Sequence, residues 1–144
     1  MGAYSPAPVV TPTIHERIMQ EVINPTLAGM AADGMPYTGF LYAGLMIDDA
    51  GNPRVIEFNC RFGDPETQPI MMRLQSDLDG LCLAALAGNL SATAAEWDDR
   101  AALGVVLAAE GYPGSYPKGA IIEGLTDADT DGVKVFHAGT ENKD

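Results

Sequence analysis

Three polar residues at alternate positions, Glu57, Asn59 and Arg61, form the part of the sequence best suited to chemistry. Alternate residues of a β-strand point to the same face, so Glu57 and Asn59 would project two oxygen ligands side by side. Mg²⁺ prefers hard oxygen ligands and usually takes only one or two from protein, with phosphates and water supplying the rest. If the strand continues to Arg61, that residue would add a planar, charged donor for a phosphate. The same spacing also fits the solvated face of an edge strand, so both interpretations stand at this point.

The triplet lies at the end of a predicted hairpin. Apolar residues 38–48 and 54–59 flank a polar turn at 49–53 that contains Gly51 and Pro53. Two such runs joined by a short turn are typical of an antiparallel pair of strands. In the second strand, Ile56 and Phe58 fall on the face opposite the polar pair, and we expect them to anchor it.

A long helix is predicted before the hairpin, over residues 13–33. Thr13 and Glu16 have the spacing of a capping box. Pro25 lacks a backbone donor, so it should kink the helix or split it after Ile23. A second helix is predicted over residues 77–87, with a short helical turn before it within 65–73. Asp77 should cap the second helix, and Gly34 and Gly88 should end the two helices.

The two ends of the chain have a different character. Residues 1–12 carry three prolines and are expected to form an extended loop. A polar connection over 89–100 separates two predicted domains, residues 1–90 and an incomplete, strand-rich domain over 91–144. Short strands are expected within 101–109, 120–123 and 133–137. The expected fold class is α+β.

Composition limits the partners. The chain has 144 residues, 20 acidic and 8 basic, with a formal charge of −12. Nucleic acids and anionic membranes attract clustered Lys and Arg, so neither partner is expected. A phosphate substrate remains compatible, because a metal ion and one or two arginines can hold it locally. No basic leader or apolar run of about 20 residues occurs, so a cytoplasmic protein is expected.

The cysteines and histidines give no sign of a site. Cys60 and Cys82 form no Cys-x-x-Cys pair and are expected to be small apolar fillers in a reducing compartment. His15 and His137 stand far apart in the sequence, and nothing resembles a catalytic triad or a zinc cluster.

Longer segments carry a resemblance to a known family. The triplet continues as Arg61-Phe62-Gly63-Asp64-Pro65-Glu66-Thr67-Gln68, and further segments at 1–8, 37–45, 103–106, 111–114 and 135–140 follow in the same order as in that family. On these residues the chain resembles the glycinamide ribonucleotide synthetase family, the phosphoribosylamine–glycine ligases of the ATP-grasp superfamily. The resemblance implies the C-terminal part of an ATP-grasp domain, an antiparallel sheet with helices, followed by part of a strand-rich C-terminal domain.

The resemblance also implies a reaction and a set of site residues. The family uses ATP and Mg²⁺ or Mn²⁺ to join glycine to 5-phosphoribosylamine through an acyl phosphate, giving glycinamide ribonucleotide in de novo purine biosynthesis. Glu57 and Asn59 match the ligands of the nucleotide-bound metal. Arg61 matches a catalytic position that touches the transferring phosphate or the acyl phosphate. The resemblance further places Tyr4, Ser5, Pro6 and Asp64 near glycine and phosphoribosylamine.

Part of the family pattern is missing. The N-terminal α/β domain and the lobe that clamps adenine and phosphates have no counterpart in this sequence, and Met1 matches an internal methionine. The chain alone is therefore expected to be inactive, with the missing N-terminal part of the same enzyme as a partner. Two alternatives remain: another ATP-grasp carboxylase or ligase, and a non-catalytic acidic interaction module derived from the ligase.

Overall fold

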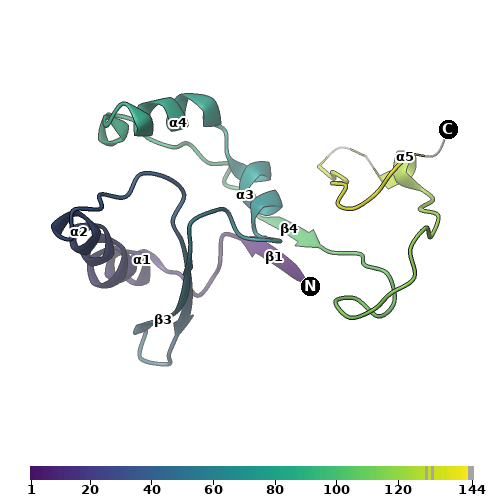
Figure 1. The fold of residues 1–144 in the computed structure, drawn as a ribbon, viewed down its shortest axis with the longest axis horizontal. Helices are drawn as coiled ribbons and strands as arrows, with labels where there is room; N and C mark the ends of the chain where they lie inside the picture. Colours follow the sequence, from purple (N-terminus) through teal and green to yellow (C-terminus); the bar gives the residue numbers. More distant parts are fainter. Residues whose placement is uncertain (129, 131, 143–144) are drawn as a thin grey trace. The chain divides into compact units, whose positions relative to one another are not determined.

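The computed structural model describes residues 1–128, 130 and 132–142. The described residues mix helices with two antiparallel pairs of strands (Figure 1), which confirms the predicted α+β class. Close contacts divide the chain into two compact units, Met1–Val105 and Val106–Asp144. Compactness does not test the domain boundary predicted after residue 90, which stays a prediction.

The predicted hairpin is present. Strand β2 (Tyr42–Ile47) pairs antiparallel with β3 (Pro53–Asn59), although β2 begins four residues later than the start of the predicted run. The pairing slips between Gly44 and Leu45, which marks a β-bulge. The turn forms because the Asp48 carboxylate accepts from the backbone N–H groups of Ala50 and Asn52, at 3.0 and 2.8 Å. Asp48 thus acts as the local acceptor that such turns favour.

The predicted long helix is divided into α1 (Pro12–Ile18), the π-helical turn η1 (Met19–Ile23) and α2 (Asn24–Ala32). The change after Ile23 confirms the split expected from Pro25. Because proline has no N–H, the ladder of hydrogen bonds cannot continue through it. Gly34 adopts a positive φ of 76° directly after the helix, as its role as a terminator requires.

The predicted cap of this helix was wrong. Thr11, rather than Thr13, is the N-cap, and its Oγ1 accepts from Ile14 N at 3.3 Å. Pro12 then occupies the first helical position, where its missing N–H costs nothing and its fixed φ suits the helix. The helix therefore begins one residue before the predicted capping box.

The expectation of an irregular N-terminal loop was also wrong for its first residues. Strand β1 (Gly2–Ser5) pairs antiparallel with β4 (Ala102–Val105), within the predicted 101–109 strand. The prolines begin at residue 6, so they end β1 without interrupting it. Gly2 is required there, because a Cβ would lie 2.6 Å from the carbonyl oxygen of Gly104.

Helix α3 (Thr67–Arg73), inside the region predicted to hold a helical turn, packs against β1 and β4. Arg73 fixes its end: Nη1 donates to Ser5 Oγ at 2.8 Å, and Nε donates to the carbonyls of Asp98 and Arg100 at 3.0 and 3.1 Å. The Arg100 guanidinium is hydrogen-bonded to Asp98 and lowers the pKa of that carboxyl to about 2.

Helix α4 (Leu78–Leu86) matches its prediction. Asp77 caps it by accepting from the backbone N–H groups of Asp79 and Gly80, and Gly88 follows it with a φ of 71°. A single 3₁₀ turn, η2 (Leu90–Ala92), comes next.

The second unit has little regular structure among its described residues. It contains the short helix α5 (Leu125–Ala128), and the strands predicted at 120–123 and 133–137 are absent. A strand is stabilised by hydrogen bonds to a neighbour, and no described residue of this unit pairs with either segment. Apolar side chains in these segments are exposed instead, with Ile121 at 87% of its full accessibility.

The core of the described chain is thin. Val22, Gly63 and Pro69 are the described residues that are buried. Ile56 and Phe58 are 64% and 40% exposed, so the expectation that they anchor β3 was wrong. Among the described residues, no helix has the length and apolar character needed to cross a bilayer.

Candidate functional site

Glu57 and Asn59 meet on one face of β3. Asn59 Nδ2 donates a hydrogen bond to Glu57 Oε1 at 3.0 Å, so the two side chains converge as their alternate spacing predicts. Gly44 lies opposite Glu57 on β2, and a Cβ there would approach Glu57 Cγ to 3.1 Å. The missing side chain at Gly44 leaves room for the Glu57 stem.

This pair fits a hard divalent cation. A carboxylate and an amide on a stiff strand supply oxygen ligands once Asn59 turns its Oδ1, rather than Nδ2, toward the ion. Two protein oxygens fill only part of an octahedron. The described residues hold no group of three or more His, Cys, Asp or Glu side chains that could complete it. The arrangement therefore suits an ion that keeps phosphate or water ligands.

Arg61 is not placed as the spacing predicts. Strand β3 ends at Asn59, so alternation does not extend to Arg61, and the exposed guanidinium donates from Nη1 to the carbonyl of Phe62 at 2.8 Å. Arg61 instead belongs to the loop that follows β3, two residues beyond Asn59. Its charge and that of Glu57 act in opposite directions on the pKa of the Tyr42 phenol.

Tyr42 and Glu66 join this cluster, and the sequence did not indicate a shared role for them. The Tyr42 hydroxyl donates to Glu66 Oε1 at 3.2 Å, and Tyr42 stands opposite Asn59 in the hairpin. Burial raises the pKa of Tyr42, as do the charge and hydrogen bond of Glu66 and the charge of Glu57, while Arg61 opposes them. Glu66 occupies the N-cap position of α3, but its side chain makes no capping hydrogen bond. The register of the hairpin was the signal that could have pointed to Tyr42.

Two family models match the chain. The ATP-grasp (A) domain of phosphoribosylglycinamide synthetase matches residues 1–67, and the C domain of the same enzyme matches residues 102–144. The phosphoribosylamine–glycine ligase of Vibrio vulnificus strain CMCP6 is 68% identical over all 144 residues, and that of Escherichia coli K12 is 65% identical over the same length.

The chain belongs to the phosphoribosylglycinamide synthetase family. It spans 34% of the length of each of these two relatives. A crystal structure of the phosphoribosylamine–glycine ligase from Thermotoga maritima shares its fold, with a TM-score of 0.68 and 36% identity over 83% of this chain and 29% of that one. The combination of helices and antiparallel strands expected from the resemblance is thereby confirmed. Since both family models describe one enzyme, they give no support to the alternative of a different ATP-grasp ligase.

The remaining positions expected to bind substrate in this synthetase family lie outside the hairpin. Tyr4 and Ser5 belong to β1, which pairs with β4, and Pro6 follows it. The Ser5 hydroxyl accepts from Arg73, whereas Tyr4 is 60% exposed. Asp64 is exposed in the loop before α3. No observation tests their roles, which stay predictions.

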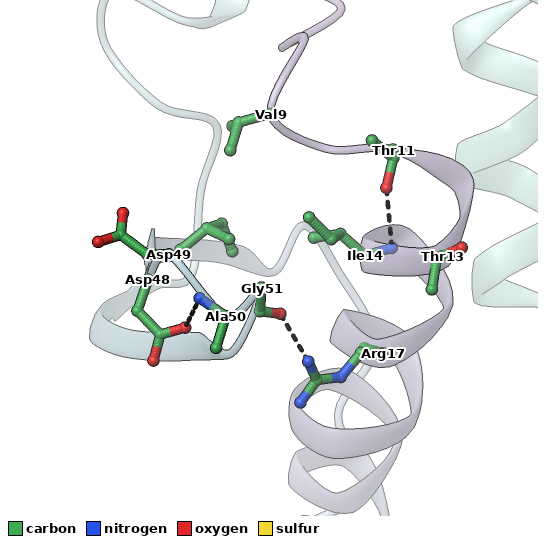
Figure 2. A pocket seen from close by; sticks show the side chains of 10 residues that line it. Val9, Thr11, Thr13, Ile14, Arg17, Asp48, Asp49, Ala50 and Gly51 are labelled. Carbon is green, nitrogen blue, oxygen red and sulfur yellow. Dashed lines mark hydrogen bonds between the residues drawn. The ribbon is translucent and has the colours of Figure 1, made fainter.

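An open groove of about 550 Å³ lies elsewhere in this synthetase segment, between the hairpin turn and the start of α1 (Figure 2). Its polar groups already hold the structure together: Asp48 accepts from the turn, and Arg17 donates to the Gly51 carbonyl at 2.8 Å. None of the predicted site residues lines it. The groove is therefore a joint between two elements rather than part of the polar face.

Cys60 also departs from expectation. It is exposed, whereas Cys82 is half-buried, and neither forms a disulfide. The prediction of two apolar fillers thus fails for Cys60, which directly follows β3 where the chain leaves the sheet.

Proposed function

We propose that this chain is the metal-binding segment of an ATP-dependent carboxylate–amine ligase that joins glycine to 5-phosphoribosylamine. The observation that carries the proposal is the contact of Asn59 with Glu57 on one face of β3. Membership of the synthetase family and the names of its relatives supply the reaction.

In this proposal Glu57 and Asn59 hold Mg²⁺ or Mn²⁺, since hard oxygen ligands suit both ions. When bound, such an ion would offset the negative charge that develops on the nucleotide phosphates. Arg61 supplies a fixed positive charge to the transferring phosphate.

The chemistry requires two transfers. The glycine carboxylate attacks the γ-phosphorus of ATP, releasing ADP and forming an acyl phosphate. The amine of 5-phosphoribosylamine then attacks the acyl carbon, loses a proton and displaces phosphate, which leaves the amide of glycinamide ribonucleotide. Such a sequence depends chiefly on positioning and charge neutralisation. Tyr4, Ser5, Pro6 and Asp64 are proposed to contact glycine and phosphoribosylamine.

The proposal also covers the cellular compartment and the partners of the enzyme. We propose a cytoplasmic enzyme of purine biosynthesis with no nucleic-acid or membrane partner, in line with its charge of −12. Its macromolecular partner is the N-terminal part of the enzyme. The 144 residues alone are expected to be inactive, because an ATP-grasp site must close over the nucleotide and exclude water.

The test is a chimera in which this chain replaces the matching third of the V. vulnificus CMCP6 relative. We expect the chimera to form ADP only when both glycine and phosphoribosylamine are present. Glu57→Ala should lower that rate by about 100-fold or more, because loss of a group that merely orients a metal ligand already costs roughly 10–100-fold.

Glu16→Ala is the matched control. Glu16 is an exposed carboxylate that accepts from Gln20 on α1, so its loss should leave the rate unchanged. Full activity in Glu57→Ala would refute the metal assignment. A folded chimera that forms no ADP would favour the non-catalytic interaction module instead.

A further inference from the structure

The loop after β3 folds back onto the hairpin at two points. The rings of Phe40, just before β2, and Phe62 meet with centroids 4.1 Å apart. Four residues later along the loop, Glu66 accepts from the Tyr42 hydroxyl at 3.2 Å. Both contacts join the loop to residues at the start of β2, so the loop is fixed to the strand that faces Glu57 and Asn59.

The space between these two contacts leaves no room for a further side chain. Gly63 is buried, and a Cβ there would lie 2.2 Å from Glu66 Oε2 and 2.9 Å from Tyr42 Cε2. Its carbonyl accepts from the hydroxyl and the backbone N–H of Thr67, at the start of α3. The path of the loop is thus determined on both sides of Gly63.

Arg61 depends on this path. It lies after the end of β3 and beside Phe62, so neither the strand nor its hydrogen-bond ladder sets its position. Arg61 stands between Asn59, which pairs with Tyr42 in the hairpin, and Phe62, whose ring meets that of Phe40, so the chain is fixed on both sides of it.

We propose that Tyr42 and Glu66 form a latch that positions Arg61 against the Glu57–Asn59 pair, so that both residues are positioning residues for the ligation reaction. The inference rests on the proposed function of the pair and adds two residues that do not themselves touch the reacting atoms. The Tyr42–Glu66 latch sets where the guanidinium stands, and the phosphate to be transferred binds between it and the metal ligands.

Three variants of the chimera test the latch. Tyr42→Phe removes only the hydroxyl, Glu66→Ala removes the acceptor, and Glu66→Gln keeps an acceptor oxygen without the charge. We expect Tyr42→Phe and Glu66→Ala to lower kcat about 10-fold, the scale seen when a group that orients a functional side chain is lost. The KM for ATP should change little, and Glu66→Gln should recover most of kcat.

Tyr116→Phe in the second unit is the control for loss of a phenol and should leave kcat unchanged. A kcat unaffected by Tyr42→Phe, or one that falls only in proportion to the amount of folded protein, would overturn the latch. Equal losses in Glu66→Gln and Glu66→Ala would do the same, because the retained acceptor should rescue a hydrogen bond.

A second readout needs no activity. In the 144-residue chain labelled at tyrosine Cζ, Tyr42→Phe identifies the Tyr42 signal, and Glu66→Gln should lower the pKa of that phenol, since Glu66 raises it. An unchanged titration would overturn the latch. If the unsubstituted chimera is inactive, the proposed function fails, and this titration alone decides whether the latch exists.

Discussion

Gly63 is the residue that most tightly constrains the loop after β3. It is buried between the carboxylate of Glu66 and the ring of Tyr42, and neither leaves room for a methyl group. The two neighbours differ in how they can respond. The carboxylate is the end of a flexible side chain and can move away, whereas the ring belongs to a strand.

Gly63→Ala is therefore expected to open the latch at a modest cost in stability, roughly 1–2 kcal/mol. Urea unfolding measures the cost, and the tyrosine titration shows whether Tyr42 has lost Glu66. Gly29→Ala is the control, since nothing lies within 4 Å of a Cβ there in α2. It should instead stabilise the chain by about 0.5–1 kcal/mol, the difference between Gly and Ala in a helix. If the pKa of Tyr42 is the same in Gly63→Ala as in the unsubstituted chain, the Tyr42–Glu66 contact tolerates the methyl group.

At the scale of elements, one arginine joins the hairpin to the first helix (Figure 2). Arg17 on α1 donates to the Gly51 carbonyl at 2.8 Å and to Asn52 Oδ1 at 2.9 Å, while Nε pairs with Glu21 at 2.7 Å. The hydrogen bond that Arg17 donates to Glu21 raises the pKa of Arg17. The planar guanidinium presents its donors in a fixed fork that reaches three residues, whereas a lysine would offer a single compact ammonium.

Arg17→Lys should consequently lower the midpoint of urea unfolding of the first unit, because the ammonium keeps fewer of these charge-assisted hydrogen bonds. Urea unfolding followed by the fluorescence of Trp97 measures it. Arg54→Lys is the matched control: its ion pair with Asp48 spans 3.6 Å and its side chain is 70% exposed, so little change is expected. Equal effects of the two substitutions would argue against a specific joint.

The elements that the sequence predicted correctly are those with local signals. Pro25 divides its helix, Asp77 caps α4, and the turn at 49–53 closes the hairpin. Strand β1 was missed because its partner β4 lies about a hundred positions further along, and a pattern of single residues does not reveal such pairing. The strands predicted in the second unit are absent for a related reason. Their segments have the apolar composition of strands, but a strand forms only when a neighbouring strand supplies hydrogen bonds.

The site residues likewise divide into those that a local pattern predicts and those that it does not. Alternation along one strand correctly brought Glu57 and Asn59 together. It failed for Arg61, because the strand ends two residues earlier. Tyr42 and Glu66 are 24 positions apart, and their contact depends on the fold of the whole loop, so no local pattern could have joined them.

At the scale of the whole molecule, the described fold leaves much apolar surface uncovered. Large apolar side chains are exposed in both units, among them Leu86 at 78% and Leu107 at 94% of full accessibility. The relatives, of which this chain spans 34%, have room to cover such surface with further residues. The proposed ligands Glu57 and Asn59 offer a metal ion only two protein oxygens, so we expect weak binding without phosphates. The nucleotide-bound ion must therefore be sought in the chimera.

The most direct measurement is a titration of the chimera with Mn²⁺, followed by electron paramagnetic resonance, with and without a non-hydrolysable ATP analogue. We expect tight Mn²⁺ binding only when the nucleotide is present. Glu57→Ala and Asn59→Ala should each weaken it by at least about 10-fold, and Glu16→Ala should leave it unchanged. Nucleotide-dependent Mn²⁺ binding of equal strength in both β3 variants would contradict the assignment of Glu57 and Asn59 as the ligands.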